Sequence, residues 1–264
     1  MSQLKRRIRR SGSQALGGSG LNQKAMTGSK GLFEMNGSFA RQLVDTIFPE
    51  RCFGCRRLSG TIWCIECRGE LERVEDPVCP RCGDPLETET CNRCRWQPPP
   101  YDSLTCGYVY NASLRGIILA LKYRGYRRLA APMGDLIRPL LIPVIHAGVE
   151  LIIPMPSDPL RGWRRGFNPA ELIAQAAVEP LGIALAPGIL RRTWGGRPQV
   201  GLNPERRRIN SEGRFCVPQP ALVTGRNAVV IDDVFTTGST CAAAARTLKA
   251  AGAAAVHALA LARD

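Results

Sequence analysis

The spacing of the cysteines constrains this chain more than any other feature of its sequence. Eight of the eleven cysteines form four C-x-x-C pairs, and each half of the array reads C-x₂-C-x₈-C-x₂-C. A C-x-x-C turn presents two thiolates to one tetrahedral metal ion, and two such turns complete a closed site. Because four protein ligands leave no open position, such an ion is structural rather than catalytic. The eight residues are Cys52, Cys55, Cys64, Cys67, Cys79, Cys82, Cys91 and Cys94.

This array predicts two structural zinc ions. A thioredoxin-like redox site needs one C-x-x-C pair rather than four. Binding of an iron–sulfur cluster by four cysteines stays open as an alternative, but the sequence shows no redox partner motif. Sequential pairing of the turns gives two four-cysteine sites, but cross-bracing between the halves stays open. Residues 50–97 carry eight arginines against nine acids, which argues against a strongly phosphate-binding surface. We expect Trp63 and Trp96 to pack on the small zinc cores rather than to stack on bases.

The N-terminal segment is basic and rich in glycine and serine. Residues 1–31 contain seven lysines and arginines and no acid, which is half of the formal net charge of +14. Without hydrophobic periodicity, residues 1–44 are predicted to form a disordered tail. The segment has no secretory h-region, and no run of 18 apolar residues occurs along the chain. We therefore expect a cytoplasmic protein without a membrane span, in which disulfides are rare.

A strand, a polar turn and a helix start follow one another near the C-terminus. Residues 229–240 read V-V-I-D-D-V-F-T-T-G-S-T, and an alanine-rich helical run comes next. The N-terminus of a helix binds anions, and Gly238 allows the backbone to approach a phosphate closely. Asp232 and Asp233, at the strand end, suit sugar hydroxyls or a hydrated Mg²⁺. The string predicts a site for a phosphate and a polyol; the alternative is a β–α turn with an ordinary N-cap.

The chain after the proline run 98–100 alternates between strand and helix patterns. Apolar strands that alternate with helices predict an α/β fold, a mostly parallel sheet with helices on both faces. We expect Ser113 to cap the first helix. The expected strands are 105–110, 150–153, 214–217, 228–232 and 254–262, and the expected helices are 114–123, 127–141, 169–181 and 239–251.

Two arginine-rich segments interrupt this alternation. Residues 161–168 form an expected turn between a strand end and a helix start, where open α/β sheets collect ligands. Residues 191–208 form a long loop rich in glycine and proline, which is typical of lids or disordered segments. Together, residues 161–214 hold ten arginines against four glutamates, which indicates an anion site, although a solvated basic loop is the alternative.

Several motifs occur in the order found in one protein family. After the C-x-x-C pairs come L-K-Y-R-G at 121–125, I-P-M-P at 153–156, R-R-G-F-N at 164–168 and the acidic string at 229–240. With these motifs, residues 45–264 resemble the ComF family of ComFC- and GntX-type proteins. The resemblance implies a type I phosphoribosyltransferase-like open parallel sheet with an N-terminal double zinc-ribbon module. Pro169 departs from the family, which more often has glutamine there.

The resemblance also implies domain bounds and a ligand. The expected domains are a tail at 1–44, a double zinc ribbon at 45–97 and a phosphoribosyltransferase-like domain at 98–264. The expected ligand is phosphoribosyl pyrophosphate (PRPP) with Mg²⁺. The residues implied to act on it are Asp232 and Asp233 as the catalytic pair at the ribose, Thr236, Thr237, Gly238, Ser239 and Thr240 at the 5′-phosphate, Pro156 and Ser157 near pyrophosphate, Arg161, Arg164 and Arg165 in a flexible hood, and Lys122 reaching toward the site.

Three functions stay open on the sequence. The first is a phosphoribosyltransferase whose acceptor is unrecognised; a histidine base is not needed, and His146 and His257 lie away from the motifs. The second is a competence factor that binds single-stranded DNA, because the family is associated with DNA uptake and the basic segments suit nucleic acid. The third is a PRPP-responsive regulator without turnover. The expected partners are PRPP or a related phosphoribosyl ligand, single-stranded DNA and competence proteins.

Overall fold

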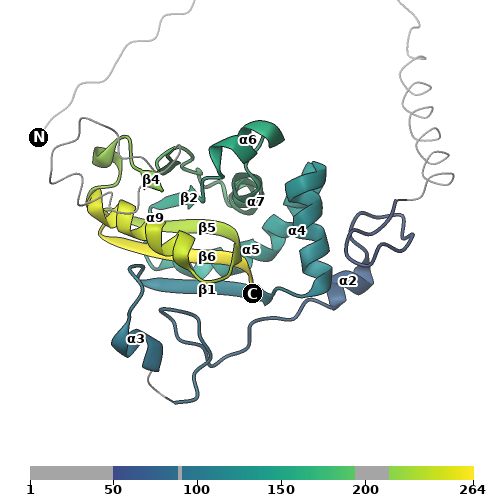
Figure 1. Ribbon diagram of the computed structural model, residues 1–264, viewed down its shortest axis with the longest axis horizontal. Coiled ribbons are helices and arrows are strands. Elements are labelled where there is room, and N and C mark those ends of the chain that lie inside the picture. Colours follow the sequence, from purple (N-terminus) through teal and green to yellow (C-terminus); the bar gives the residue numbers. More distant parts are fainter. Residues whose placement is uncertain (1–49, 89–90, 194–213) are drawn as a thin grey trace, which may run out of the picture. The chain divides into compact units, whose positions relative to one another are not determined.

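The computed structural model describes residues 50–88, 91–193 and 214–264 (Figure 1). The predicted tail at 1–44 and most of the basic loop at 191–208 lie outside the described residues. Within the described chain, the two halves of the cysteine array precede an α/β domain.

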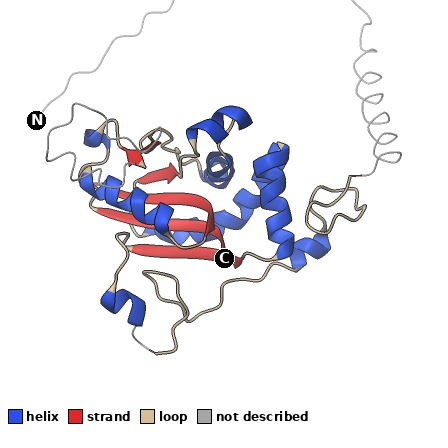
Figure 2. Ribbon diagram, in the orientation of Figure 1, coloured by secondary structure: helices blue, strands red, loops and turns tan. Residues whose placement is uncertain are grey.

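The core of the α/β domain is a four-stranded sheet (Figure 2). Its strands are β1 (Ser103–Val109), β6 (Ala255–Arg263), β5 (Asn227–Phe235) and β2 (Leu151–Pro154), in that spatial order. All three pairings are parallel, as the alternation of apolar strands and helices predicted. Because parallel strands end at the same edge, the residues that follow β2 and β5 come together there.

Helices cover both faces of this sheet, which confirms the predicted α/β class. Side chains alternate along β5, so Val229 and Ile231 pack on one face while Val230 packs on the other. The first face is covered by α5 (Ala130–His146) and α7 (Pro169–Val178). The second is covered by α9 (Ser239–Ala250), which lies across β5 and β6 in Figure 1.

Helix α4 (Ala112–Arg124) follows β1 and ends as predicted, but it begins differently. Gly125 ends it in the left-handed conformation, with φ of 71°. The N-cap is Asn111, whose Oδ1 accepts from the backbone N–H of Leu114 at 3.0 Å. The prediction that Ser113 is the cap is therefore wrong. Ser113 is buried in the first turn, and its hydroxyl donates to the carbonyl of Cys67 at 3.3 Å.

The arginine-rich segment after β2 also differs from expectation. It forms helix α6 (Pro159–Arg165) rather than an irregular turn, because Asp158 caps the backbone N–H of Arg161 at 3.1 Å. Gly166 then ends the helix with φ of 70°. The remaining elements are α2 (Ile65–Gly69), α3 (Asn92–Trp96), the 3₁₀ turns Arg127–Leu129, Glu179–Leu181 and Pro220–Leu222, and the antiparallel pair β3 (Arg191–Arg192) and β4 (Phe215–Cys216).

Among the described residues, one helical segment is long and apolar enough to cross a membrane by length and composition. It is Arg127–His146, with a mean hydropathy of 1.2. In this structure 33% of its 18-residue apolar window is buried; Met133, Ile137 and Leu141 are fully buried, and α5 packs against α7 and β6.

The two cysteine-rich halves pack on different parts of the α/β domain. The first half lies on α4: a side chain at Gly116 would approach the carbonyl oxygen of Phe53 to 2.2 Å. The second half lies beside β1, where the backbone N–H of Leu104 donates to the carbonyl of Pro80 at 3.0 Å. Between them the chain runs along β1, and Val74 donates to Gly107 at 3.1 Å. The residues around Val74 thus pair with β1, an outer strand, and cover that edge of the sheet.

Candidate functional site

The eight paired cysteines gather into two compact clusters. Within each cluster the four sulfur atoms lie within 4.8 Å of one another. A tetrahedral zinc ion with Zn–S bonds of about 2.3 Å holds its sulfurs about 3.8 Å apart. The clusters match this spacing, for example at 3.8 Å between the Sγ atoms of Cys55 and Cys64, and therefore fit two structural zinc ions. The grouping follows chain order: Cys52, Cys55, Cys64 and Cys67 in the first, and Cys79, Cys82, Cys91 and Cys94 in the second.

Backbone amides prepare one thiol in each cluster to bind metal as thiolate. Burial raises the pKa of Cys52, but the backbone N–H groups of Cys64 and Cys55 outweigh it and lower the pKa to about 7. Burial also raises the pKa of Cys79, but the backbone N–H groups of Cys82 and Arg81 outweigh it and lower the pKa to about 7. Burial raises the pKa of Cys67 and Cys82 instead, so one thiol of each cluster rather than the whole set is prepared as a thiolate ligand.

The two tryptophans near the clusters differ in their exposure to solvent. Trp63 is only 2% exposed and packs in the core with the first cluster, as predicted. Trp96 is 82% exposed, so the prediction that it packs on a zinc core is wrong. It ends the short helix α3, and Arg95 lies 5.8 Å from its ring centroid.

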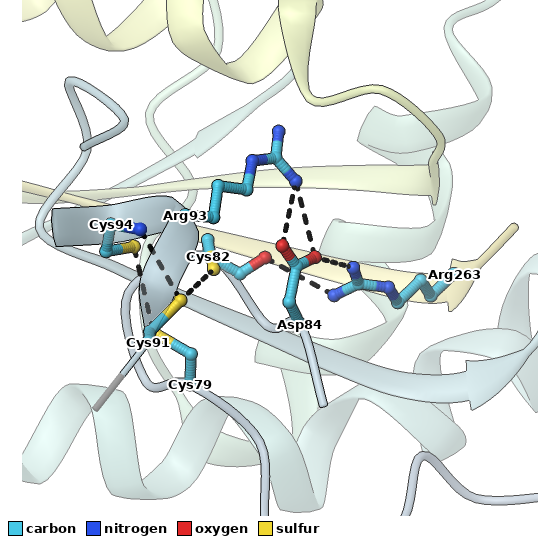
Figure 3. A network of polar contacts seen from close by, with 7 residues as sticks. All are labelled: Cys79, Cys82, Asp84, Cys91, Arg93, Cys94 and Arg263. Atoms are coloured by element: carbon cyan, nitrogen blue, oxygen red, sulfur yellow. Dashed lines mark hydrogen bonds and ion pairs between the residues drawn. The ribbon is translucent and has the colours of Figure 1, made fainter. Parts of the chain in front are cut away.

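A carboxylate ties the second cluster to the end of the sheet (Figure 3). Asp84, two residues after Cys82, accepts from Arg93 at 3.1 Å and from Arg263 at the end of β6. Arg263 also donates to the carbonyl of Cys82 at 3.3 Å. Its guanidinium lies 5.8 Å from the ring centroid of Phe235, the last residue of β5. The second cluster is thus connected to the strand end that carries the acidic pair.

The acidic pair lies within β5 rather than after it. The strand was expected to end at Asp232, but it pairs with β6 up to Phe235. Consecutive side chains therefore point to opposite faces. Asp233 is 6% exposed, and its Oδ1 accepts from Lys122 Nζ of α4 at 2.7 Å. This ion pair compensates a carboxylate that is costly to bury alone.

Asp232 has a different environment. Its Oδ1 accepts from the backbone N–H of Asp233 at 2.9 Å. Burial and the charge of Asp233 raise its pKa to about 7, although Lys122 and Arg192 oppose the shift. The two adjacent carboxylates thus have different environments: Asp233 pairs with a lysine, whereas Asp232 exchanges a proton near neutral pH.

The turn from β5 to α9 has the form that an anion site needs. Gly238 occupies the N-cap position with φ of 75°, and a side chain there would meet Phe235 Cζ at 2.6 Å. Only glycine fits this position without strain. Thr237 Oγ1 accepts from the backbone N–H of Ser239 at 3.4 Å. The hydroxyls of Thr237 and Ser239 are exposed.

The neighbouring strand end contributes a short loop before α6. The loop begins at Met155 and contains Pro156 and Ser157. Asn168 Nδ2 donates to the carbonyl of Met155 at 2.9 Å, which fixes the loop to the start of α7. Asn168 occupies the N-cap position of α7 as predicted, but its side chain makes no capping bond.

These elements surround a cavity of about 560 Å³. It brings together most of the residues that the sequence singled out: Lys122, Pro156, Ser157, Arg161, Arg165, Asp232, Asp233, Thr236 and Thr240. Thr237, Gly238 and Ser239 do not line it, although they belong to the same turn. Arg164 lines a neighbouring cavity instead.

The cavity also has lining residues that the sequence reasoning did not identify as ligands. Arg192 of β3 lines the cavity. Its position is set by the pairing of β3 with β4, in which Arg192 lies opposite Phe215. Tyr123 and Asn168 lie inside recognised motifs, at L-K-Y-R-G and R-G-F-N, so the motifs offered a signal that was not used. His257 is outside the cavity and contacts the Ser103 hydroxyl at 2.8 Å, a structural role as expected.

The chain resembles known proteins in both of its parts. Residues 43–95 match the family model described as a double zinc ribbon domain. Over 227 residues the chain is 34% identical to the DNA utilization protein YhgH of Escherichia coli K12, covering 81% of this chain and 97% of that protein. It is 29% identical to competence protein F of Haemophilus influenzae, with 82% and 98% covered, and 28% identical to competence protein ComFC of Bacillus subtilis, with 73% and 80% covered.

Among solved structures, an adenine phosphoribosyltransferase matches with a TM-score of 0.32 and 16% identity over 53% of this chain and 73% of that chain. The allosteric regulatory enzyme of purine biosynthesis matches with a TM-score of 0.34 and 21% identity over 50% of this chain and 26% of that one. Since both TM-scores lie below 0.5, the fold of this chain rests on its own sheet order and pairing.

Removing one ligand of the second cluster should remove one zinc ion and leave the other. We expect about two zinc ions per chain in the native protein and about one in Cys82→Ser, because three thiolates without a fourth hold zinc weakly. Elemental analysis of the purified proteins measures this ratio. Cys106→Ser, at a cysteine outside both clusters, should retain two. Two zinc ions in Cys82→Ser would refute the assignment.

Replacing Asp232 by asparagine should stabilise the fold at neutral pH and above. In the unfolded chain an aspartate titrates at about pH 3.9. Between that pH and about 7, the folded chain keeps a proton on Asp232 that the unfolded chain releases. The bound proton stabilises the fold, and this stabilisation is lost as the pH rises to about 7. Asparagine avoids the loss. We expect a gain of about 1–2 kcal/mol in the free energy of unfolding above pH 7 and none near pH 4, since partial exposure screens the charge.

Urea unfolding across this pH range measures the difference between the two proteins. Effects of pH on the zinc ligands are common to both and cancel. Glu179→Gln, at an exposed position, should follow the native protein. A difference that does not change with pH would show that Asp232 does not carry the effect.

Proposed function

This chain belongs to the ComF family, and on that premise we propose that the cavity at the carboxyl end of β5 binds PRPP as its magnesium complex. The observation that carries the proposal is that two carboxylates and Thr240, in the first turn of α9, line a single cavity of about 560 Å³. A sugar phosphate needs both kinds of group, acceptors for its hydroxyls and donors for its phosphate.

The carboxylates are assigned to the ribose. Asp232 and Asp233 each accept hydrogen bonds, and the ring hydroxyls of a ribose are donors. Lys122 donates to Asp233 at 2.7 Å and holds this carboxylate in place before the ligand arrives. Asp232 gains a partner for its negative charge when Mg²⁺ or a hydroxyl approaches.

The turn after β5 is assigned to the 5′-phosphate. Residues 236–240 combine the hydroxyls of three threonines and one serine with unpaired backbone N–H groups at the start of α9. The positive end of the helix dipole favours a dianion there. Thr236 and Thr240 line the cavity in the unliganded chain, and Thr237, Gly238 and Ser239 complete the loop around a phosphate.

The lining residues outside β5 and α9 are assigned to pyrophosphate and its Mg²⁺. They include Pro156 and Ser157 of the loop after β2 and the arginines Arg161, Arg165 and Arg192. Arginine presents planar donors to phosphate oxygens, and Mg²⁺ binds phosphates with few protein ligands. In a transferase these arginines would neutralise the leaving pyrophosphate; in a PRPP-responsive regulator they would serve binding alone. Release of pyrophosphate in the presence of a panel of bases separates the two.

A second proposed function concerns DNA, and the names of the relatives favour it. They are a DNA utilization protein and two competence proteins. We propose that this chain acts in the cytoplasm in DNA uptake and contacts single-stranded DNA and competence proteins. The arginines of α6 and the basic segments at 1–31 and 191–208 would supply the contacts to phosphates.

Calorimetric titration with PRPP and Mg²⁺ tests the ribose assignment. We expect saturable binding to the native chain and a loss of at least about 100-fold in Asp232→Asn/Asp233→Asn, because the variant weakens two hydrogen bonds to charged acceptors, each worth about 1.5–3 kcal/mol. Asp135→Asn, an exposed acid on α5, is the control and should bind normally. Unchanged affinity in the double variant would make the assignment wrong.

Binding of an oligothymidylate at increasing salt tests the DNA proposal. We expect the logarithm of the association constant to fall linearly with the logarithm of the salt concentration, with a slope of about −0.7 for each phosphate contact. Fluorescence anisotropy of a labelled strand measures the slope. An absence of binding at low salt would exclude direct contact with single strands.

A further inference from the structure

A second cavity adjoins the proposed PRPP pocket. It has a volume of about 520 Å³ and shares Lys122, Tyr123, Arg161 and Arg165 with the first. It adds Arg164 and Phe167 and contains neither the acidic pair nor the turn before α9. No acid is among its lining residues. Its chemistry therefore differs from that of a sugar phosphate site.

Aromatic rings and guanidinium groups alternate in a series of contacts that includes three lining residues of this cavity, Phe167, Arg165 and Tyr123. Arg127 lies 4.6 Å from the ring centroid of Phe167. Arg165 lies between Phe167 and Tyr123, at 5.9 Å and 5.3 Å from their centroids. Such stacks are favourable because a ring face attracts a cation. The stack ends at Tyr123, which is 64% exposed and thus has room for one more planar group.

Three arginines that line this cavity lack a carboxylate partner among the residues that the structure describes, whereas Lys122 pairs with Asp233. Within the described part of the chain, the side chains of Arg161, Arg164 and Arg165 form no ion pair with a carboxylate. Asp158, the nearest acid in sequence, accepts from the backbone of Arg161 rather than from its side chain. A neutral ligand would leave three guanidinium groups uncompensated, whereas an anion would match them.

We propose that this cavity binds a planar aromatic ligand that carries a negative charge, such as a six-membered heteroaromatic carboxylate. Its ring extends the stack on Tyr123, and its anionic group lies against Arg161 and Arg164. The inference rests on the proposed function in one respect, since it makes this molecule the neighbour of PRPP at a shared wall of Lys122 and Arg165.

Matched pairs of small ligands test the proposal on the full zinc-loaded chain. The probes are pyridine-3-carboxylate, pyrimidine-4-carboxylate and their carboxamides, which keep the ring and remove the charge. We expect each carboxylate to bind at least tenfold more tightly than its carboxamide in calorimetric titrations. Arg164→Gln should reduce this preference to about twofold or less, because it removes the guanidinium that reads the charge.

Aromatic variants test the stacking. Tyr123→Ala should weaken both members of each pair by at least fivefold, whereas Tyr123→Phe should stay within twofold of the native chain. Trp163→Ala removes another exposed aromatic, 79% exposed, from α6 outside both cavities and should change nothing. Zinc content and circular dichroism establish that every variant is folded.

Two results would overturn the proposal: carboxylates that bind no better than their carboxamides, or Tyr123→Ala that binds them like the native chain. PRPP is titrated into the same samples. If PRPP does not bind but the carboxylates bind through Tyr123, the proposed function fails and this inference stands. If PRPP binds and neither carboxylate does, this inference fails alone.

Discussion

The ion pair between Lys122 and Asp233 is the interaction on which the arrangement of the site depends. Asp233 is nearly inaccessible and lies next to a second carboxylate, so without a cation it would be a strongly destabilising buried charge. The lysine comes from the last turn of α4, far from β5 in sequence. One contact therefore fixes α4 to the strand end beside Asp232, whose pKa is raised by burial and by the charge of Asp233 and is opposed by Lys122.

Both zinc-binding halves are connected to this strand end. The first acts through α4: Ser113 at its start donates to Cys67, and Lys122 at its end holds Asp233. The second acts through Arg263. Its guanidinium donates to Asp84, two residues after Cys82, and lies over the ring of Phe235, which packs against Gly238. A chain with small apolar ribbons gains rigidity from metal rather than from core volume. Each ribbon thus contacts an element that positions the pocket: the first contacts α4, and the second contacts the end of β6.

The sequence predicted the parts of the molecule whose cause is local. The C-x-x-C spacing indicated two clusters, and apolar strands alternating with helices indicated the parallel sheet. Predictions failed where contacts between residues distant in sequence determine the local structure. Asn111 and Ser113 are both good caps, and only the carbonyl of Cys67 determines that Ser113 points elsewhere. Arg192 reaches the cavity through a strand pair distant in sequence, which no local pattern reveals.

The claim that one cavity holds both a sugar and its 5′-phosphate is tested most directly by a crystal structure of the chain with ribose 5-phosphate. We predict that the ring hydroxyls lie within hydrogen-bonding distance of Asp232 and Asp233, and that the phosphate lies in the turn of residues 236–240 at the start of α9. A phosphate bound among the arginines of α6 instead, with the sugar turned away from both carboxylates, would contradict it.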